Sequence, residues 1–184
     1  MRGIRRLVVV MLLVLASLPA GASAAVPSGR FGVGDSIMLS AEDELAAYDI
    51  AINAEVGRQF SEGLPIVRRL VKNEKLPRNL IVHLGTNGSI QQGDCDRLVE
   101  LAAGRRIFLV TIKVPREWQD PNNDLLNACA NAYDRVHIVR WFAYSNDHPE
   151  WFADDGYHPN AEGQQAYADL IDGDIKKVLK ARRG

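Results

Sequence analysis

Apolar stretches of two kinds alternate along the chain, and each kind predicts a different element. Short, largely apolar runs are typical of strands buried in a parallel sheet, and the chain has them at residues 30–34, 79–85, 105–114 and 135–141. Residues 48–56 predict a further strand, with a mixed alternation of apolar and polar positions. Apolar residues at helical spacing predict helices over 63–76, 121–133 and 160–180, and Asp94 is placed to cap a further helix that carries Leu98 and Val99. Strands that alternate with helices predict an α/β fold, in which helices cover both faces of a parallel sheet.

The first 24 residues have a pattern of their own. Arg2, Arg5 and Arg6 precede an uninterrupted apolar run from residue 7 to residue 15, and Ala22-Ser23-Ala24 matches a cleavage site. This order of charge, apolar run and small residues predicts a secretory signal peptide over 1–24. The alternative is an uncleaved membrane anchor, but the run ends before Pro19 and falls short of the about 20 residues that span a bilayer. We therefore expect one domain, residues 25–184, secreted or extracytoplasmic and without a stable membrane span after cleavage.

The net charge and the two cysteines restrict which partners and metal sites the protein can have. The chain has 22 basic and 23 acidic residues, and removing the three arginines of the predicted signal leaves 19 basic against 23 acidic. A net charge of −4 is unlike the basic surface that nucleic acids require, so we expect no nucleic-acid partner. Cys95 and Cys129 are the two cysteines. In an oxidising compartment such a pair favours a disulfide, and two thiols are too few for a tetrahedral zinc site.

Three polar clusters follow predicted strands. Gly34-Asp35-Ser36 follows the first, Gly85-Thr86-Asn87-Gly88 the third, and Asp155-Gly156-Tyr157-His158 comes after the last strand and its long loop, 142–154, which we expect to be irregular. Ligands of open parallel sheets bind outside the carboxyl ends of the strands. We therefore expect the three clusters to meet in one site.

The residue types at these strand ends fit acyl transfer through a serine. A serine hydroxyl needs a base, imidazole serves as one near neutral pH, and a carboxylate orients the imidazole. Ser36 is the candidate nucleophile, His158 the base and Asp155 the orienting acid, while Asp154 is expected to face solvent or to cap locally. The candidate oxyanion donors are the Ser36 N–H, the Asn87 amide and Gly57.

Each motif also has an ordinary structural explanation. Gly-Asp-Ser and Asn87 occur in plain turns, and His158-Pro159 is suited to open a helix. It is the conjunction of the three clusters at one sheet edge that favours a catalytic site. His83 and His137 lie within apolar strands and are expected to be core residues with satisfied hydrogen bonds, or residues that support a site without contacting its ligand. Trp118 and His148 are candidate substrate-binding residues. No HExxH-type spacing occurs, so we predict neither a metal nor another cofactor.

The motifs, taken in order, resemble those of the SGNH (GDSL-like) hydrolases. The segments "GDSIM" (34–38), "AEVGRQ" (54–59), "GTNG" (85–88) and "DGYH" (155–158) are similar to four of the family's sequence blocks. The nucleophile elbow G-x-S-x-G of α/β-hydrolases is absent from "GDSIM". The resemblance implies a three-layer α/β/α sandwich with a parallel sheet, the flavodoxin-like SGNH hydrolase fold, and it implies the roles given above for Ser36, Gly57, Asn87, Asp155 and His158.

Within that family the motifs are especially similar to the extracytoplasmic SGNH domains attached to acyltransferase membrane proteins, which include peptidoglycan O-acetyltransferases. Two departures stand out: Gly88 replaces the aspartate of many SGNH hydrolases, and the usual Gly-Asn pairing is missing near Gly57. The printed sequence has no multi-span membrane domain to supply acyl groups. We therefore expect a secreted serine esterase acting on carbohydrate or small esters. The alternatives are an O-acetyltransferase on cell-envelope glycan, served by a membrane acyl-donor partner, and a non-catalytic glycan-binding module.

Overall fold

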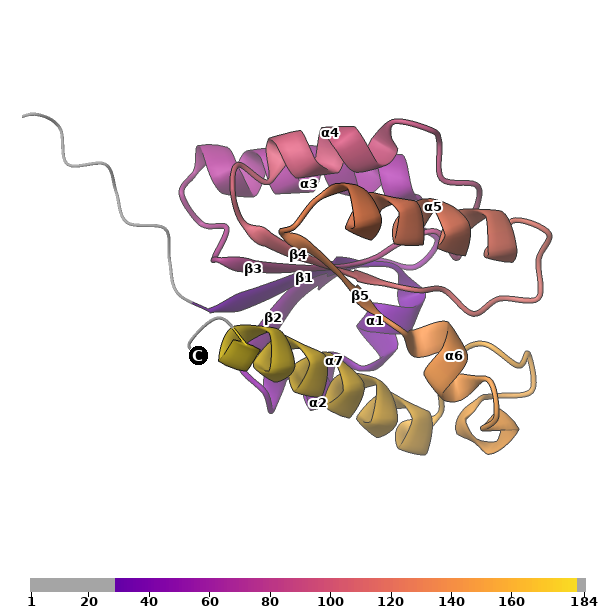
Figure 1. Ribbon diagram of the computed structural model, residues 1–184. Coiled ribbons are helices and arrows are strands. Elements are labelled where there is room, and N and C mark those ends of the chain that lie inside the picture. The colour runs from indigo at the N-terminus through magenta and orange to yellow at the C-terminus, as the bar shows by residue number, and fades with distance from the viewer. Residues whose placement is uncertain (1–28, 182–184) are drawn as a thin grey trace, which may run out of the picture.

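The computed structural model describes residues 29–181, and the predicted signal peptide lies outside this range. A single parallel sheet of five strands forms its centre, in the order β2-β1-β3-β4-β5 (Figure 1). The strands are β1 (Arg30–Gly34), β2 (Ile50–Ala54), β3 (Asn79–His83), β4 (Arg106–Val110) and β5 (Val136–Val139). They lie within the predicted strands, although the apolar runs extend beyond them into the loops at the sheet edge.

Helices cover both faces of the sheet, as Figure 1 shows. On one side lie α3 (Phe60–Lys72), α4 (Asp94–Leu101) and α5 (Gln119–Ala132); on the other lie α1 (Ser36–Ser40), α2 (Glu42–Ala46), α6 (Trp141–Ser145) and α7 (Ala161–Ala181). Each side has its own buried apolar cluster, one with Val33, Val82 and Leu109 and the other with Ile81, Phe108 and Trp141. Alternate strand residues thus face opposite layers, and the fold is the three-layer α/β/α sandwich expected from the sequence.

The strand order fixes where a site can form. From β1 the chain moves outward to β2 and then returns to β3 on the other side of β1. The carboxyl ends of β1 and β3 therefore lie side by side at a switch point, which is where ligands bind in sheets of this order. Ser36 follows β1 and Asn87 follows β3, so both clusters stand at this point.

The sequence patterns missed several short helices. The loop 142–154, predicted to be irregular, instead contains most of α6 and a 3₁₀ turn at Pro149–Trp151. The predicted strand 48–56 begins only at Ile50, because α2 ends at Ala46 and residues 47–49 form a turn, in which Asp49 has a φ of +56°. Helices of five residues have too few turns to display a helical period. Their buried residues, such as Leu45 and Trp141, pack into the layer beside α7.

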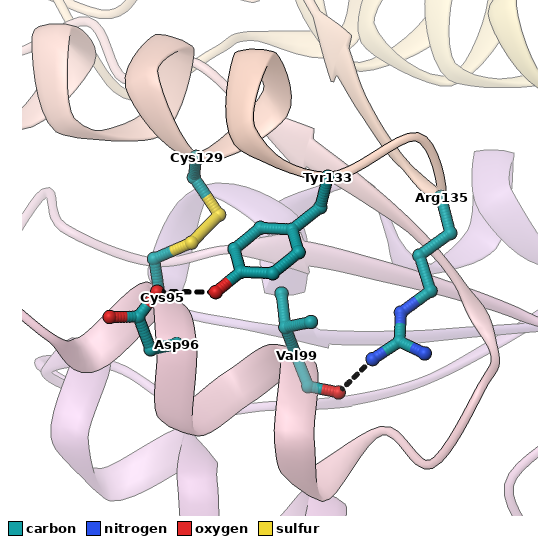
Figure 2. The surroundings of a disulfide bond; sticks show 6 residues. All are labelled: Cys95, Asp96, Val99, Cys129, Tyr133 and Arg135. Carbon is teal, nitrogen blue, oxygen red and sulfur yellow. Dashed lines mark hydrogen bonds between the residues drawn. A yellow bond between two sulfur atoms is a disulfide. The ribbon is translucent and has the colours of Figure 1, made fainter.

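The predicted disulfide is present. Cys95 of α4 and Cys129 of α5 are bonded, with 5.9 Å between their Cα atoms. Figure 2 shows that the bridge joins these two neighbouring helices, and that the Tyr133 hydroxyl donates to Asp96 beside it. The bridge therefore fastens the helix layer that lies across the sheet from α7. Within residues 29–181, none of the helices is both long enough and apolar enough to cross a membrane.

Candidate active site

Ser36 is held at the turn from β1 into α1. The side chain of Asp35 caps the helix by accepting the Ile37 N–H at 3.0 Å, and Asp35 is completely buried. Gly34 makes the turn sterically possible, since a Cβ atom there would lie 2.5 Å from the Cβ of Met38. Ser36 is therefore the first helical residue, where backbone N–H groups have no partner within the helix. Its hydroxyl and its N–H both stand at the carboxyl edge of the sheet.

The hydroxyl of Ser36 contacts His158. Ser36 Oγ lies 2.9 Å from His158 Nε2, and the opposite ring nitrogen, Nδ1, lies 2.6 Å from Asp155 Oδ2. The other carboxylate oxygen of Asp155 accepts the backbone N–H groups of Tyr157 and His158. Asp154 is exposed to solvent. The structure thus brings Ser36, His158 and Asp155 into one hydrogen-bonded chain, in the order that a nucleophile, base and orienting acid require.

The protonation of this chain follows from its contacts. Partial burial would raise the pKa of the Asp155 carboxyl, but hydrogen bonds from the backbone and ring of His158 and from the Tyr157 backbone outweigh it and hold that pKa below its usual value. An ionised Asp155 favours the tautomer with the proton on Nδ1. The lone pair of Nε2 then faces Ser36, and the serine hydroxyl donates to it.

Besides the Ser36 N–H, the candidate oxyanion donors are Gly57 and Asn87, which lie on two neighbouring loops. Gly57, in the loop after β2, is exposed and has a φ of +79°, a backbone conformation that glycine adopts without strain. Asn87, in the loop after β3, donates its side-chain amide to the main-chain oxygen of Arg58 at 3.3 Å. This bond uses one of the two amide hydrogens of Asn87. The structure therefore joins the Asn87 side chain to the residue that follows Gly57.

Asn122 of α5 supports the Asn87 loop, and the sequence around Asn122 gave no indication of this role. Its side chain, buried on α5, donates to the carbonyl oxygens of Gly85 and Gly88 at 2.9 Å each and accepts the Ile90 N–H at 2.8 Å. These three bonds span the whole "GTNG" segment. Asn122 and its neighbour Asn123 are both buried on α5 beside Leu126 and Cys129, and this burial is set by the fold and not by a pattern in the sequence.

A buried polar layer lies beneath the nucleophile. The backbone N–H of Asp35 donates to the carbonyl of His83, and His83 Nδ1 lies 2.7 Å from the Tyr167 hydroxyl. Burial lowers the pKa of the His83 ring, although the nearby Asp35 carboxylate opposes this. His83 is therefore a neutral, fully buried residue between β3 and α7, in agreement with the expectation that it belongs to the core.

The two candidate substrate-binding residues lie in different surroundings. The Trp118 indole N–H donates to the carbonyl of Thr86 at 3.2 Å, so this half-buried ring lies next to the Asn87 loop. His148 stacks on Trp151 with 3.7 Å between ring centroids, and its Nδ1 contacts Glu150. Trp118 is thus anchored beside the site, whereas these contacts of His148 are within its own segment.

Comparison with known proteins gives clear relatives. The chain is 34% identical over 142 residues to the O-acetyltransferase OatA of Staphylococcus aureus, a match that covers 76% of this chain and 24% of that protein. It is 33% identical over 142 residues to the peptidoglycan O-acetyltransferase OatA of Listeria monocytogenes, covering 76% and 22%. The match thus spans less than a quarter of the length of these relatives. No protein-family model matches the chain.

Solved structures show the same fold. The C-terminal catalytic domain of peptidoglycan O-acetyltransferase A from Streptococcus pneumoniae superposes with a TM-score of 0.72 at 23% identity, over 86% of this chain and 96% of that one. A GDSL-like lipase from Bacteroides thetaiotaomicron gives a TM-score of 0.64 at 19% identity, over 84% and 92%.

The chain therefore has the fold of the SGNH (GDSL-like) hydrolases, a class of α/β enzymes. Within that class its sequence is similar to the O-acetyltransferases named OatA, as the resemblance of its motifs implied.

Proposed function

We propose that this domain is an SGNH-type O-acetyltransferase that moves an acetyl group, by way of Ser36, to a hydroxyl of a cell-envelope glycan. The observation that carries the proposal is the hydrogen-bonded chain from Ser36 to His158 to Asp155, in a sequence 34% identical to an O-acetyltransferase. The motifs of the sequence, without a multi-span membrane domain, favour hydrolysis as the main activity. The sequence relatives support the alternative, transfer, better than that first preference.

In the first half-reaction Ser36 accepts the acyl group. His158 Nε2 takes the proton from Ser36 Oγ as this oxygen attacks the carbonyl carbon of the acyl donor. The carbonyl oxygen becomes an oxyanion, which the Ser36 N–H, the Gly57 N–H and the Asn87 amide are proposed to stabilise. When the tetrahedral intermediate collapses, the bond to the leaving group breaks and His158 gives that group its proton. The product is an acetyl ester on Ser36.

In the second half-reaction the acceptor replaces the leaving group. His158 takes the proton of the acceptor hydroxyl, whose oxygen attacks the acyl-serine, and collapse returns the proton to Ser36 Oγ. If water is the acceptor, acetate is released and the enzyme acts as an esterase. Esterase and transferase therefore share every residue of the mechanism and differ only in which acceptor reaches the acyl-serine.

Substrate and location are parts of the same proposal. The names of the relatives support peptidoglycan as the acceptor, and Trp118, anchored beside the Asn87 loop, is proposed to contact a sugar ring. The predicted signal peptide supports an extracytoplasmic domain, with the acetyl donor delivered by a membrane partner. A purely binding module has no use for a base aligned on a serine hydroxyl, so we do not propose one.

One experiment separates transfer from hydrolysis. The domain covering residues 25–184 is incubated with a chromogenic acetate ester, with and without soluble peptidoglycan fragments, and the fragments are analysed by mass spectrometry. A transferase adds acetyl groups to the fragments at the expense of free acetate. Ester cleavage that yields only acetate, at every acceptor concentration, would instead assign an esterase.

A further inference from the structure

Arg58 is an arginine with almost no exposure at the rim of the candidate active site. It follows Gly57 directly, and only 8% of its surface is accessible. Arginine is rarely buried unless its guanidinium is paired and hydrogen-bonded. Its position within "AEVGRQ" therefore raises the question of what the buried guanidinium holds.

The guanidinium links the carboxyl end of β1, which leads into Ser36, to the carboxyl end of the neighbouring strand β2. One terminal nitrogen donates to the carbonyl oxygens of Gly34 at 3.0 Å and Asn53 at 2.5 Å. Gly34 ends β1 two residues before Ser36, and Asn53 lies near the end of β2. The side chain thus crosses from the loop of Gly57 to the turn that carries Ser36.

The main chain of Arg58 makes the third connection. Its carbonyl oxygen accepts the Asn87 side-chain amide at 3.3 Å. One residue therefore contacts all three segments that supply the proposed oxyanion donors: the Ser36 turn, the Gly57 loop and Asn87.

The salt bridge of Arg58 is the less important of its contacts. Glu55 lies 3.0 Å from the other terminal nitrogen, but its side chain is 73% exposed. Ion pairs that reach into solvent contribute little. The contacts of the first terminal nitrogen of Arg58 are better shielded from water: the bond to the Gly34 carbonyl, which also accepts the Glu55 N–H, is buried, and the bond to the Asn53 carbonyl is partly buried. Hydrogen bonds from a charged donor contribute more than neutral ones.

We propose that Arg58 is a positioning residue, which sets the spacing of the oxyanion donors around Ser36; this role rests on the proposed function. Arg58 does not touch the reacting atoms and acts through Gly34, Gly57 and Asn87. Displacements of about 1 Å in such donors can lower a rate by roughly 10²-fold. Loss of the guanidinium should therefore slow acyl transfer and leave substrate binding nearly unchanged.

Arg30 provides a matched control. It too is a largely buried arginine, with contacts to the Asp172 carboxylate at 2.6 Å and to the carbonyl of Tyr48. It lies at the opposite end of β1, where the strands begin. A purely structural arginine should affect stability alone. Arg30→Ala measures the effect of removing such an arginine, at the end of β1 that lies away from Ser36.

The test compares Arg58→Ala, Arg58→Lys, Glu55→Gln and Arg30→Ala with the wild type, using stopped-flow cleavage of a chromogenic acetate ester. The amplitude of the initial burst counts competent sites, so misfolded protein is separated from slow protein. We expect kcat per competent site to fall roughly 10- to 100-fold in Arg58→Ala with KM within about threefold, and to fall less in Arg58→Lys. Glu55→Gln and Arg30→Ala should keep wild-type kcat per site.

A double-mutant comparison tests whether Arg58 acts through Asn87. In an Asn87→Ala background, Arg58→Ala should lower kcat by a smaller factor than it does alone, since the two residues act on the same oxyanion.

Several results would overturn this role. One is a wild-type kcat per competent site in both Arg58 variants. A loss of burst amplitude without a slower rate per site would show that Arg58 is structural only. Equal losses in the wild-type and Asn87→Ala backgrounds would also contradict it. A wild-type domain with neither a burst nor turnover would instead overturn the proposed function, and the positioning role with it.

Discussion

Ser36 Oγ and His158 Nε2 lie 2.9 Å apart although 122 residues separate them in the chain. The two residues come from distant parts of the sequence: Ser36 lies at the turn after β1, and His158 lies in the segment before α7. Their contact is possible because α7 packs beside α1 and α2 on the same face of the sheet (Figure 1). The fold itself thus brings the base to the nucleophile.

Two neighbouring aspartates provide a direct test of how His158 is oriented. Both aspartates are exposed, but Asp155 contacts His158 Nδ1 at 2.6 Å, and this contact is what distinguishes it from Asp154. Asp155→Asn should lower kcat by roughly 10⁴-fold, because an amide can stabilise the wrong tautomer of the ring. Asp154→Asn, the matched control, should stay within a few-fold of the wild type. Ester-cleavage kinetics of the two variants decide the matter, and a large loss in Asp154→Asn alone would reassign the acid.

Asn87 should act on the transition state and not on substrate binding. Asn87→Ala is expected to lower kcat by roughly 10²–10³-fold, the usual cost of one oxyanion donor, with little change in KM. The structural reason is its place after β3, at the switch point beside Ser36. The measurement is the full substrate dependence of ester cleavage. If only KM rose, Asn87 would be a substrate-binding residue.

The disulfide should stabilise the fold without affecting catalysis. The bridge closes a loop with a sequence separation of 34 residues, which in the chain-entropy model corresponds to roughly 3–4 kcal/mol. A Cys95→Ala/Cys129→Ala variant should therefore melt about 10 °C lower. Its kcat at a temperature where it is fully folded should equal that of the wild type, because α4 and α5 supply none of Ser36, His158 and Asp155. An unchanged melting temperature would contradict the prediction.

Asp172, which lies away from the candidate active site, should make the stability of the fold depend on pH. Its carboxylate, 9% exposed, pairs with Arg30 and Lys176. Burial would raise the pKa of Asp172, but its hydrogen bonds with Lys176 and Arg30 outweigh this and lower it. A lowered pKa in the folded state means that the stabilisation is complete above the usual pKa of about 4 and is lost as the pH falls below it.

The corresponding experiment compares unfolding of Asp172→Asn and the wild type by urea at pH 7 and pH 3. The variant should be less stable at pH 7, by roughly 2 kcal/mol, because Arg30 loses a charged hydrogen-bond partner. At pH 3 the difference should shrink, since the wild-type carboxylate is then becoming protonated. If the difference in unfolding free energy between the wild type and the variant grew towards pH 3, the pKa of Asp172 would be raised in the folded state and not lowered.

Much of the sheet could be predicted from the sequence, since its strands are continuous apolar runs bounded by glycine or polar residues. The placement of Ser36 and Asn87 at one edge of the sheet was also predictable, because each follows a parallel strand and the carboxyl ends of parallel strands meet at one edge. The placement of Asp155 depends in addition on α6 and the 3₁₀ turn, which separate it from β5. The short helices were not. Trp141 and Trp151 belong to α6 and the 3₁₀ turn but are buried by contacts with Tyr167 and with each other, and such tertiary contacts leave no period in the sequence.

The residues that support the site were the hardest to predict. Arg58 and Asn122 hold the loops through main-chain carbonyl oxygens of segments more than 20 residues away. A carbonyl oxygen is present at every residue, so the sequence gives no indication of which carbonyls a side chain will meet. Only the fold specifies these contacts, and they are therefore invisible to motif comparison.

Acylation of Ser36 is the central step of the proposed mechanism, and peptide mass spectrometry measures it directly. The domain is mixed with a chromogenic acetate ester, quenched in acid within the burst, digested and mapped, with Ser36→Ala treated in parallel. We predict that the peptide containing Ser36 gains the mass of one acetyl group, and that the Ser36→Ala variant gains none and loses turnover by roughly 10⁴-fold or more. Turnover near the wild-type rate in Ser36→Ala, or an acetyl group found on another residue of the active wild type, would contradict the account.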